Sequence, residues 1–261
     1  MRDRIPRTVP QFPLLESRQN AKFKAWLAYA QHPEDVECPW LPVEGWKNLS
    51  DLRQPIELLL FSDPAEPRLS PLLSRAREAL QLAPHLMDAL SQVTSPQAVL
   101  GFIKKPSWDW NRMTPWVLYL DRLQDPGNLG TLLRTARATG LFSIAASPGS
   151  VSCFNAKVVR ASAASLYAVP FLPGVRLEEL RRRGHTVWAA VPGGGRLLYH
   201  ARFEPPSAFM IGNEGAGLDP AVLADSEFRL SIPMRDDSES LNAGVAGSII
   251  MYEVYRQRMF V

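Results

Sequence analysis

Short apolar runs alternate with segments of helical periodicity through the carboxy-terminal half of the chain. The apolar runs predict strands at residues 116–120, 142–146, 185–191, 207–211 and 227–232. The segments between them predict helices at residues 129–139, 156–165, 177–183 and 220–225, and a long closing helix that opens at Ser240-Leu241-Asn242. Because strands that alternate with helices favour a parallel sheet with helices on both faces, we expect an α/β domain over residues 116–261.

A smaller α/β domain is expected before it, over residues 15–103. Phe23, Trp26 and Leu27 have the spacing of an amphipathic helix, predicted over residues 17–31. Strands are predicted at residues 40–43, 56–61 and 98–103, with a helix-rich stretch at residues 71–90 that is broken at Pro84. Residues 104–115 contain two prolines and no periodicity, which predicts a linker.

The distribution of charge suggests a partner without requiring one. The chain has 261 residues, a formal net charge of +3 and a pI near 9.0, which fit nucleic-acid binding but also many other proteins. Its amino end is locally basic and includes a predicted basic tail at residues 1–14. Either an RNA-contacting arm or a solvated tail explains this basic stretch. Its basic side chains are Arg2, Arg4, Arg7, Arg18, Lys22 and Lys24.

Cysteine and histidine usage gives no indication of a metal centre. Cys38 and Cys153 are too few and too far apart for a disulfide framework or a thiolate metal site, and the four histidines lack ligand spacing. We therefore expect no metal. No apolar run approaches the ~20 residues that span a bilayer, and the amino end lacks the apolar stretch of a secretory signal. The expected location is the cytoplasm, with no membrane association.

Glycines and polar residues follow two of the predicted strands, and this arrangement indicates a binding site. The turn 212–217 comes directly after the strand at 207–211, and Glu214 within it is either a surface carboxylate or a hydrogen-bond acceptor at the site. The strand at 227–232 leads into a polar loop with Asp236, Asp237 and Ser238. In a parallel sheet, ligands lie at the carboxyl ends of strands beside helix N-termini, so we expect the site there.

The helix predicted at residues 129–139 is amphipathic, and Asn128 is a plausible N-cap for it. Arg134 should face outward, where a solvated surface arginine is the ordinary interpretation. Ser240 and Asn242 are expected to cap the closing helix. The predicted buried stripe comprises Leu129, Leu132, Leu133 and Ala136, and the opposite side comprises Gly130, Arg134 and Arg137.

Three ordered segments resemble the motifs of the SpoU (TrmH-like) family of RNA ribose 2′-O-methyltransferases, which belongs to the SPOUT superfamily. The first is the N-x-G-x-x-x-R pattern from Asn128 to Arg134, the second is the glycine-rich turn 212–217, and the third is I-P-M at 232–234 followed by S-L-N at 240–242. The resemblance implies a carboxy-terminal trefoil knot, S-adenosylmethionine as methyl donor and a homodimer formed through the carboxy-terminal domain. It further implies that residues 15–103 are an RNA substrate-binding domain, with ribosomal RNA favoured over transfer RNA.

The resemblance also assigns roles to individual residues. Those implied to be catalytic are Asn128, Arg134, Glu214, Ser240 and Asn242. Those implied to contact S-adenosylmethionine are Gly212, Ile232, Met234 and Leu241. Arg18, Lys22 and Lys24 at the amino end are candidates for contact with RNA. The segment at 154–162 resembles a family helix in which Lys157 and Arg160 can bind RNA phosphate. Both charges are equally compatible with a solvated helix face. The family usually has a serine at the position of Gly244.

Two other functions fit parts of the sequence. A non-catalytic RNA-binding protein that retains the fold is the main alternative, although Asn128, Arg134, Glu214 and Asn242 are all present. A nucleotide-dependent oxidoreductase is disfavoured, because the glycine order G-x-x-G-x-G at 212–217 is the reverse of the dinucleotide fingerprint.

Overall fold

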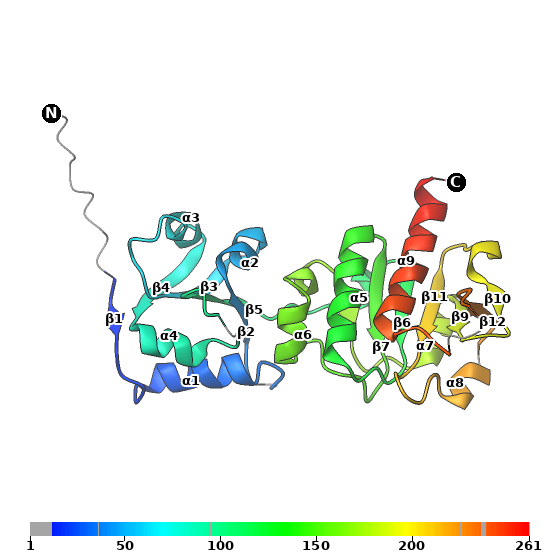
Figure 1. The fold of residues 1–261 in the computed structure, drawn as a ribbon, viewed down its shortest axis with the longest axis horizontal. Helices are drawn as coiled ribbons and strands as arrows, with labels where there is room; N and C mark the ends of the chain where they lie inside the picture. Colours follow the sequence, from blue (N-terminus) through cyan, green and yellow to red (C-terminus); the bar gives the residue numbers. More distant parts are fainter. Residues whose placement is uncertain (1–11, 36, 94, 225, 236–238, 261) are drawn as a thin grey trace. The chain divides into compact units, whose positions relative to one another are not determined.

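The computed structural model describes residues 12–35, 37–93, 95–224, 226–235 and 239–260. The chain divides into two compact units, with the boundary between Lys105 and Pro106 (Figure 1). Within the described residues, no helix combines the length and the apolar character needed to cross a membrane.

The first unit is built on a five-stranded sheet with the order β1-β4-β3-β5-β2. β3 pairs with β4, and β4 with β1, in parallel, whereas β5 is antiparallel to both β2 and β3. Its elements are β1 (Leu14–Leu15), α1 (Ala21–Gln31), β2 (Trp40–Glu44), α2 (Trp46–Asp51), β3 (Ile56–Phe61), α3 (Leu69–Leu73), β4 (Ala76–Leu82), α4 (Pro84–Leu90) and β5 (Val99–Lys104).

One core cluster of this unit lies between the sheet and two helices, α1 and α4. The predicted apolar stripe of α1 is confirmed, because Phe23 and Trp26 are buried and Leu27 is partly buried against the same cluster. The helix begins at Ala21 rather than at residue 17, because the Asn20 side chain accepts the N–H groups of Lys22 and Phe23 and so forms the N-cap.

The prediction of a helix-rich stretch over residues 71–90 is wrong in its middle. Residues 76–82 form strand β4, although Ala, Arg, Glu, Leu and Gln are good helix formers. β4 is placed between β1 and β3, and pairing on both edges outweighs the local helix propensity. Pro84 does not interrupt a helix here but occupies the first turn of α4, where a missing N–H costs nothing.

The second unit contains a seven-stranded sheet in which all recorded pairings are parallel, with the order β10-β12-β9-β11-β6-β7-β8. The strands are β6 (Trp116–Leu120), β7 (Phe142–Ala146), β8 (Phe171–Leu172), β9 (Thr186–Ala190), β10 (Arg196–Leu197), β11 (Ser207–Ile211) and β12 (Phe228–Ser231). The helices are η1 (Trp110–Arg112), α5 (Pro126–Thr139), α6 (Ala156–Ala161), η2 (Ser165–Tyr167), α7 (Leu177–Arg182), η3 (Leu198–His200), α8 (Pro220–Ala224) and α9 (Ala243–Met259). The parallel α/β sheet expected from the sequence is present.

Helices cover both faces of this sheet. On one face, α5 and α9 lie side by side (Figure 1), and a side chain at Gly247 of α9 would meet Leu132 of α5 and Leu118 of β6. On the other face, Leu177 and Leu180 of α7 pack into a cluster with alternate residues of the strands. Trp108 and Trp110, from the segment predicted as a linker, also pack against this cluster.

Gly130 is where α5 and α6 approach most closely. The sequence placed it on the outward side of α5, but it is buried, because α6 covers that side of the helix. A Cβ at Gly130 would lie 2.4 Å from the Cβ of Ala161 and 3.0 Å from its carbonyl carbon. Only glycine permits this helix spacing.

The substitution Gly130→Ala is therefore expected to lower the free energy of unfolding by about 2 kcal/mol, since overpacking against backbone atoms forces the helices apart. Urea denaturation measures the change. Thr131→Ala, at the next and exposed position of α5, is the control and should leave stability nearly unchanged. Equal stability of Gly130→Ala and the wild type would contradict the packing argument.

Candidate functional site

Asp125, and not Asn128, is the N-cap of α5. The Asp125 Oδ1 atom accepts the N–H of Asn128 at 2.7 Å, and Pro126 occupies the first turn. The prediction that Asn128 caps the helix is wrong, because an aspartate followed directly by a proline is a strong start signal and lies three residues earlier in the chain. As a result, the amide side chain of Asn128 is available for another partner.

That partner is Glu214, in the glycine loop, which we define as residues 212–219. Asn128 Nδ2 donates to Glu214 Oε1 at 2.9 Å. The N–H of Asp125 donates to the same oxygen at 3.0 Å, and the N–H of Gln124 donates to Oε2 at 3.2 Å. The carboxylate thus lies at the N-terminus of α5, where backbone N–H groups and the helix dipole favour a negative charge.

These contacts change the acidity of Glu214. Burial alone would raise its pKa, but the hydrogen bonds from Asn128 and from backbone N–H groups, including those of Asp125 and Gln124, outweigh that effect and lower the pKa below the ordinary value of 4.5. Glu214 is therefore charged at neutral pH, and its negative charge is part of the connection between the two loops.

Asn213 shapes the glycine loop. Its Oδ1 atom accepts the N–H groups of Gly215 and Ala216, each at 2.9 Å. Asn213 and Gly217 also exchange two backbone hydrogen bonds, and Gly217 has a φ of +69°. A Cβ at Gly212 would lie 2.3 Å from backbone atoms of Gly217, so the loop folds back on itself at a distance that only glycine allows.

The third segment reaches the same place through α9. Asn242 is the N-cap of this helix and accepts the N–H of Val245 at 3.2 Å, as predicted, whereas Ser240 is exposed and precedes the cap. A Cβ at Gly244 would lie 3.1 Å from Asn128 Oδ1 and 3.2 Å from Asn242 Oδ1. The two amide oxygens therefore flank one point, and the small residue at position 244 allows α9 to lie this close to α5.

Arg134 lies on the exposed face of α5, six residues beyond Asn128. Six residues correspond to about 9 Å along a helix axis. Within the described part of the chain its guanidinium makes no hydrogen bond or ion pair, so the structure brings Asn128, Glu214 and Asn242 together but shows no contact between them and Arg134. The outward orientation predicted for Arg134 and Arg137 is confirmed.

The four residues expected to contact a cofactor are neither buried in the core nor fully exposed. Gly212 follows β11, Ile232 and Met234 follow β12, and Leu241 precedes α9, and all four are half-buried. Apolar side chains with one open side and a bare glycine backbone suit a ligand with an apolar and a polar part. The predicted loop residues Asp236, Asp237 and Ser238 lie outside the described residues.

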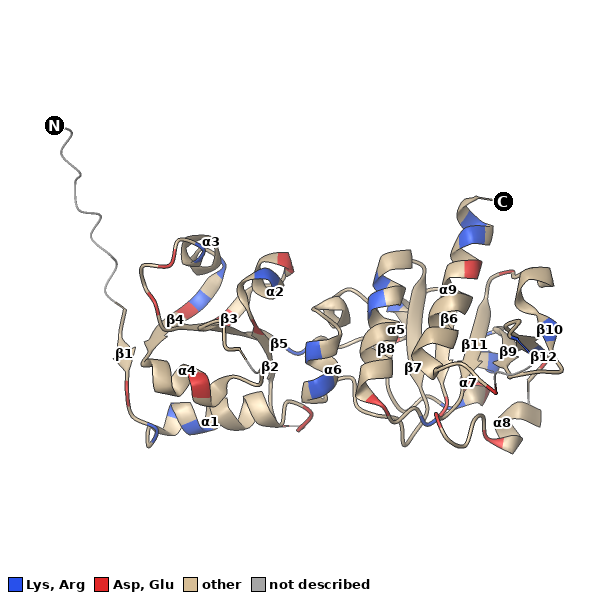
Figure 2. Ribbon diagram, viewed as in Figure 1, with Lys and Arg blue, Asp and Glu red and all other residues tan. Residues whose placement is uncertain are grey.

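The residues proposed to contact RNA are exposed in both units, and the ribbon of each unit carries Lys and Arg positions, coloured blue in Figure 2. In the first unit, Arg18 donates to the carbonyl of His85 at 3.2 Å and Lys24 donates to Gln19 at 2.7 Å. In the second unit, Lys157 and Arg160 lie on the exposed face of α6. Lys22 is also exposed, and the predicted basic residues Arg2, Arg4 and Arg7 lie outside the described residues.

Sequence reasoning did not identify Asp121 and Arg122. Asp121 is an acidic residue that directly follows β6, yet it is only 3% exposed. Its Oδ2 atom accepts the N–H of Asp219 at 2.8 Å, which ties the end of the glycine loop to the end of β6. A buried acidic residue immediately after an apolar strand was the available signal, since such residues are almost never buried without partners.

Comparison with known proteins identifies relatives along most of the chain. The model of the SpoU rRNA Methylase family matches residues 115–252. The 23S rRNA (guanosine(2553)-2'-O)-methyltransferase RlmP of Bacillus subtilis is 29% identical over 247 residues, which cover 92% of this chain and 98% of that protein. The 23S rRNA (uridine(2479)-2'-O)-methyltransferase of Streptomyces viridochromogenes is 31% identical over 267 aligned residues, covering 92% of this chain and 91% of that protein.

Among solved structures, the SpoU methyltransferase AviRb from Streptomyces viridochromogenes, in complex with the cofactor AdoMet, is similar in fold. The TM-score is 0.80 at 26% sequence identity, and the alignment covers 93% of this chain and 99% of that chain. The similarity thus includes both units and not only the second.

The lowered pKa of Glu214 predicts how its contribution to stability depends on pH. The folded protein favours the charged form, so the contribution is fully present above pH 4.5 and is lost as the pH falls through the lowered pKa. At neutral pH, Glu214→Gln should lower the free energy of unfolding, because the carboxamide has a donor in place of one acceptor oxygen. The expected loss is only about 1 kcal/mol, because solvent screens this exposed position.

Urea denaturation at pH 7 and at successive values below 4.5 tests this prediction, and the difference from the wild type should shrink as the pH falls. Glu204→Gln is the matched control, since the Glu204 side chain is 83% exposed and its nearest cation lies 3.8 Å away. A difference that stays constant down to low pH would show that the charge of Glu214 is not what holds the loops.

Proposed function

Because the chain belongs to the SpoU rRNA methylase family, we propose that it transfers a methyl group from S-adenosylmethionine to a ribose 2′-hydroxyl of ribosomal RNA. The predicted family and the predicted class of enzyme, an RNA methyltransferase, are confirmed by the family match and by the named relatives. The observation that supports the proposed chemistry most directly is the hydrogen bond from Asn128 to Glu214, which joins the first and second motifs in space.

Ribosomal RNA is the proposed substrate because the two relatives named for 23S rRNA align with nearly the whole of this chain, including its first unit. We propose that residues 15–103 are the RNA substrate-binding domain. No finding favours the alternative of a non-catalytic RNA-binding protein.

The residues at the carboxyl ends of β11 and β12 fit the methyl donor. We propose that the half-buried side chains of Ile232, Met234 and Leu241 contact its apolar parts and that the backbone at Gly212 contacts its polar parts. The glycine backbone suits this role, since the fold of the loop leaves no room there for a side chain. S-Adenosylmethionine, when bound, supplies an electrophilic methyl group on a positively charged sulfur.

Arg134 is proposed to orient the RNA and to stabilise charge, not to remove a proton. The ribose 2′-hydroxyl must lose its proton as it becomes a nucleophile, and an arginine with a pKa above 12 is a poor base. A planar guanidinium instead binds a phosphate through two parallel hydrogen bonds, which fixes the ribose beside Asn128 and Glu214 while the proton passes to a phosphate oxygen or to water. Ser240 and Asn242 are proposed to complete the site.

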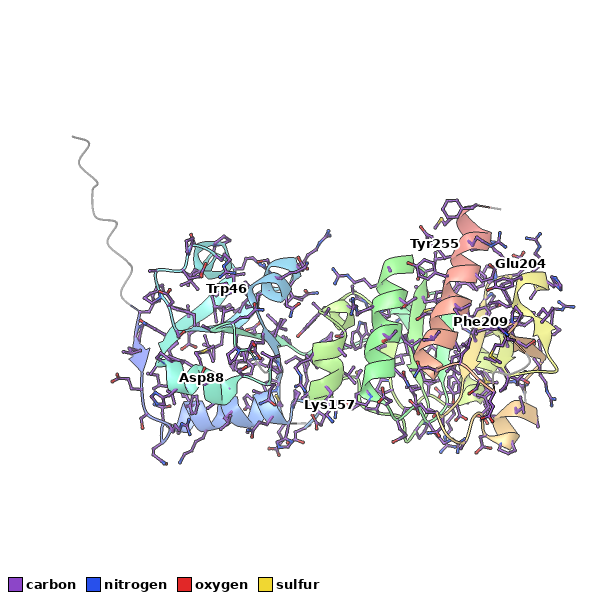
Figure 3. The ribbon with its side chains drawn as sticks, viewed as in Figure 1. Trp46, Asp88, Lys157, Glu204, Phe209 and Tyr255 are labelled. Atoms are coloured by element: carbon purple, nitrogen blue, oxygen red, sulfur yellow. The ribbon has the colours of Figure 1, made fainter. Side chains whose placement is uncertain are left out.

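Exposed basic residues on α5 and α6 are proposed to contact RNA phosphates outside the site. Arg137 lies one turn beyond Arg134 on α5, and Lys157 and Arg160 lie on α6 (Figures 2 and 3). The two helices pack together at Gly130, so their exposed cations belong to neighbouring elements. Phosphate contacts of this kind position RNA without reading its sequence. We propose the same role for Arg18, Lys22 and Lys24 in the first unit.

Helix α9 carries the surface proposed for a homodimer. Val245, Tyr252 and Met259 are 45%, 53% and 52% exposed and follow one another at intervals of seven residues, so they form an apolar stripe on one face of the helix. A row of large apolar side chains at the surface is typical of an interaction site, whereas single exposed apolar side chains are not. By family membership we also propose a carboxy-terminal trefoil knot and a cytoplasmic location.

The experiment that tests the proposed function is methylation of ribosomal RNA by the purified full-length chain, followed by mapping of ribose 2′-O-methylation across the RNA. One new modified ribose that requires both the protein and S-adenosylmethionine is expected. Methylation of transfer RNA but not of ribosomal RNA would contradict the choice of substrate. Absence of S-adenosylmethionine binding in calorimetry would favour the non-catalytic alternative.

The variant Arg134→Lys is expected to reduce the rate of methylation by about 100-fold, because lysine keeps the charge but loses the bidentate geometry that positions the phosphate. Single-turnover rates and calorimetry with S-adenosylmethionine make the comparison, and the affinity for the methyl donor should not change. Arg112→Lys, at an exposed position of η1, is the control. Near-normal methylation by Arg134→Lys would refute the need for a guanidinium.

The variant Tyr252→Asp is expected to convert the dimer to a monomer, because it places an unpaired charge in the middle of the apolar stripe. Sedimentation velocity measures the change. Tyr199→Asp, at a tyrosine that is 55% exposed on η3, is the matched control and should remain a dimer. A monomeric wild type, or a dimeric Tyr252→Asp variant, would contradict the proposed interface.

A further inference from the structure

Arg122 has an unusual backbone conformation at the end of β6. Its φ is +54°, a left-handed conformation that residues with a side chain rarely adopt. The conformation is held from both sides, since the N–H donates to Ser147 Oγ at 2.8 Å and the carbonyl accepts from Asn213 Nδ2 at 3.0 Å. A conformation that glycine adopts more easily is thus kept with an arginine in place.

The side chain of Arg122 lies between two carboxylates. Its Nε atom donates to Asp121 Oδ1 at 3.3 Å and its Nη2 atom donates to Asp121 Oδ2 at 3.2 Å. Its Nη1 atom lies 3.6 Å from Asp219 Oδ2. The side chain of Asp121 is only 4% exposed, so the guanidinium supplies the charge that this buried carboxylate needs. Arg122 thereby links the end of β6 to the far end of the glycine loop.

Residues that follow β6 hold the glycine loop along its length. Just before the loop, the N–H of Asp121 donates to the carbonyl of Ile211 at 2.8 Å, and near its start Asn213 Nδ2 donates to the carbonyl of Arg122 at 3.0 Å. In its middle, Glu214 accepts from Gln124 and Asp125. At its end, Asp121 and Arg122 hold Asp219.

From this geometry we infer that Arg122 is a positioning residue, which holds the glycine loop in the conformation that binds the methyl donor. The inference rests on the proposed function, since it concerns the affinity of that same site. Fixing a loop before a ligand arrives reduces the ordering that binding requires, and it strengthens binding without any contact to the ligand. The left-handed backbone opposes stability, and the contacts of the guanidinium offset that cost.

The substitution Arg122→Gly removes the guanidinium and relieves the backbone conformation at once. It also leaves the buried Asp121 carboxylate without its cation, so the free energy of unfolding should fall despite the relief of the backbone. The dissociation constant for S-adenosylmethionine should rise about tenfold, because the loop is no longer ordered in advance. Calorimetric titration of the full-length chain with S-adenosylmethionine and urea denaturation give the two readouts.

Arg122→Lys keeps the charge and the backbone conformation but cannot bridge both carboxylates, and its affinity should lie between those of the wild type and Arg122→Gly. Ala164→Gly is the matched control, since Ala164 also has a left-handed φ, of +64°, but precedes η2 on a different connection. It should leave the dissociation constant unchanged.

Equal affinity of Arg122→Gly and the wild type would overturn the inference. An equal loss of affinity in Arg256→Ala, which leaves the buried Glu253 carboxylate of α9 without its cation, would also overturn it, because it would mean that any loss of stability weakens binding. A wild type that binds no S-adenosylmethionine would refute the proposed function and, with it, this inference, whereas the outcomes for Arg122→Gly leave the proposed function intact.

Discussion

The carboxylate of Glu214 at the N-terminus of α5 is the interaction on which the rest of the site depends. A helix start presents unpaired N–H groups, and here two backbone N–H groups and the Asn128 amide all donate to one side chain from a loop about 90 residues away along the chain. Because the acceptor is charged, these hydrogen bonds are stronger than neutral ones and keep the pKa of Glu214 low. These hydrogen bonds therefore hold the loop and the helix together at the carboxyl ends of β6 and β11.

Close helix packing brings the third segment to this element. Gly244 and Gly247 lie on the side of α9 that faces α5, where side chains would meet Asn128 and Leu132 respectively. Two interior glycines weaken an isolated helix by roughly 1 kcal/mol each, so their presence in α9 makes physical sense only through the short distance they allow. That distance places the amide oxygens of Asn128 and Asn242 around one point. The glycine in place of the usual family serine thus belongs to the packing of this particular chain.

Local patterns in the sequence predicted the parts of the fold that depend on neighbours along the chain. The strands at 116–120, 142–146 and 207–211 have the predicted bounds, because uninterrupted apolar runs define buried parallel strands. Strand β4 was missed because its residues favour a helix and only pairing with β1 and β3 makes it a strand. The motifs indicated Asn128 and Glu214, but the hydrogen bond between them, the cap at Asp125 and the left-handed Arg122 depend on contacts across the fold, which spacing along a sequence does not contain.

Two groups of cations in the second unit differ in whether they are available to RNA. Arg122 and Arg256 are paired with the buried carboxylates of Asp121 and Glu253, and releasing either arginine would leave a charge unpaired in the interior. Neither arginine can leave its carboxylate for an RNA phosphate without a large loss of stability. The exposed cations of α5 and α6 make no ion pair within the described residues, so a phosphate can bind them without breaking a contact of the fold. Arg134 and Arg137 share α5 with Asn128, and Arg134 is the nearer of the two along the helix. An exposed guanidinium without a protein partner among the described residues suits a residue whose partner is the substrate.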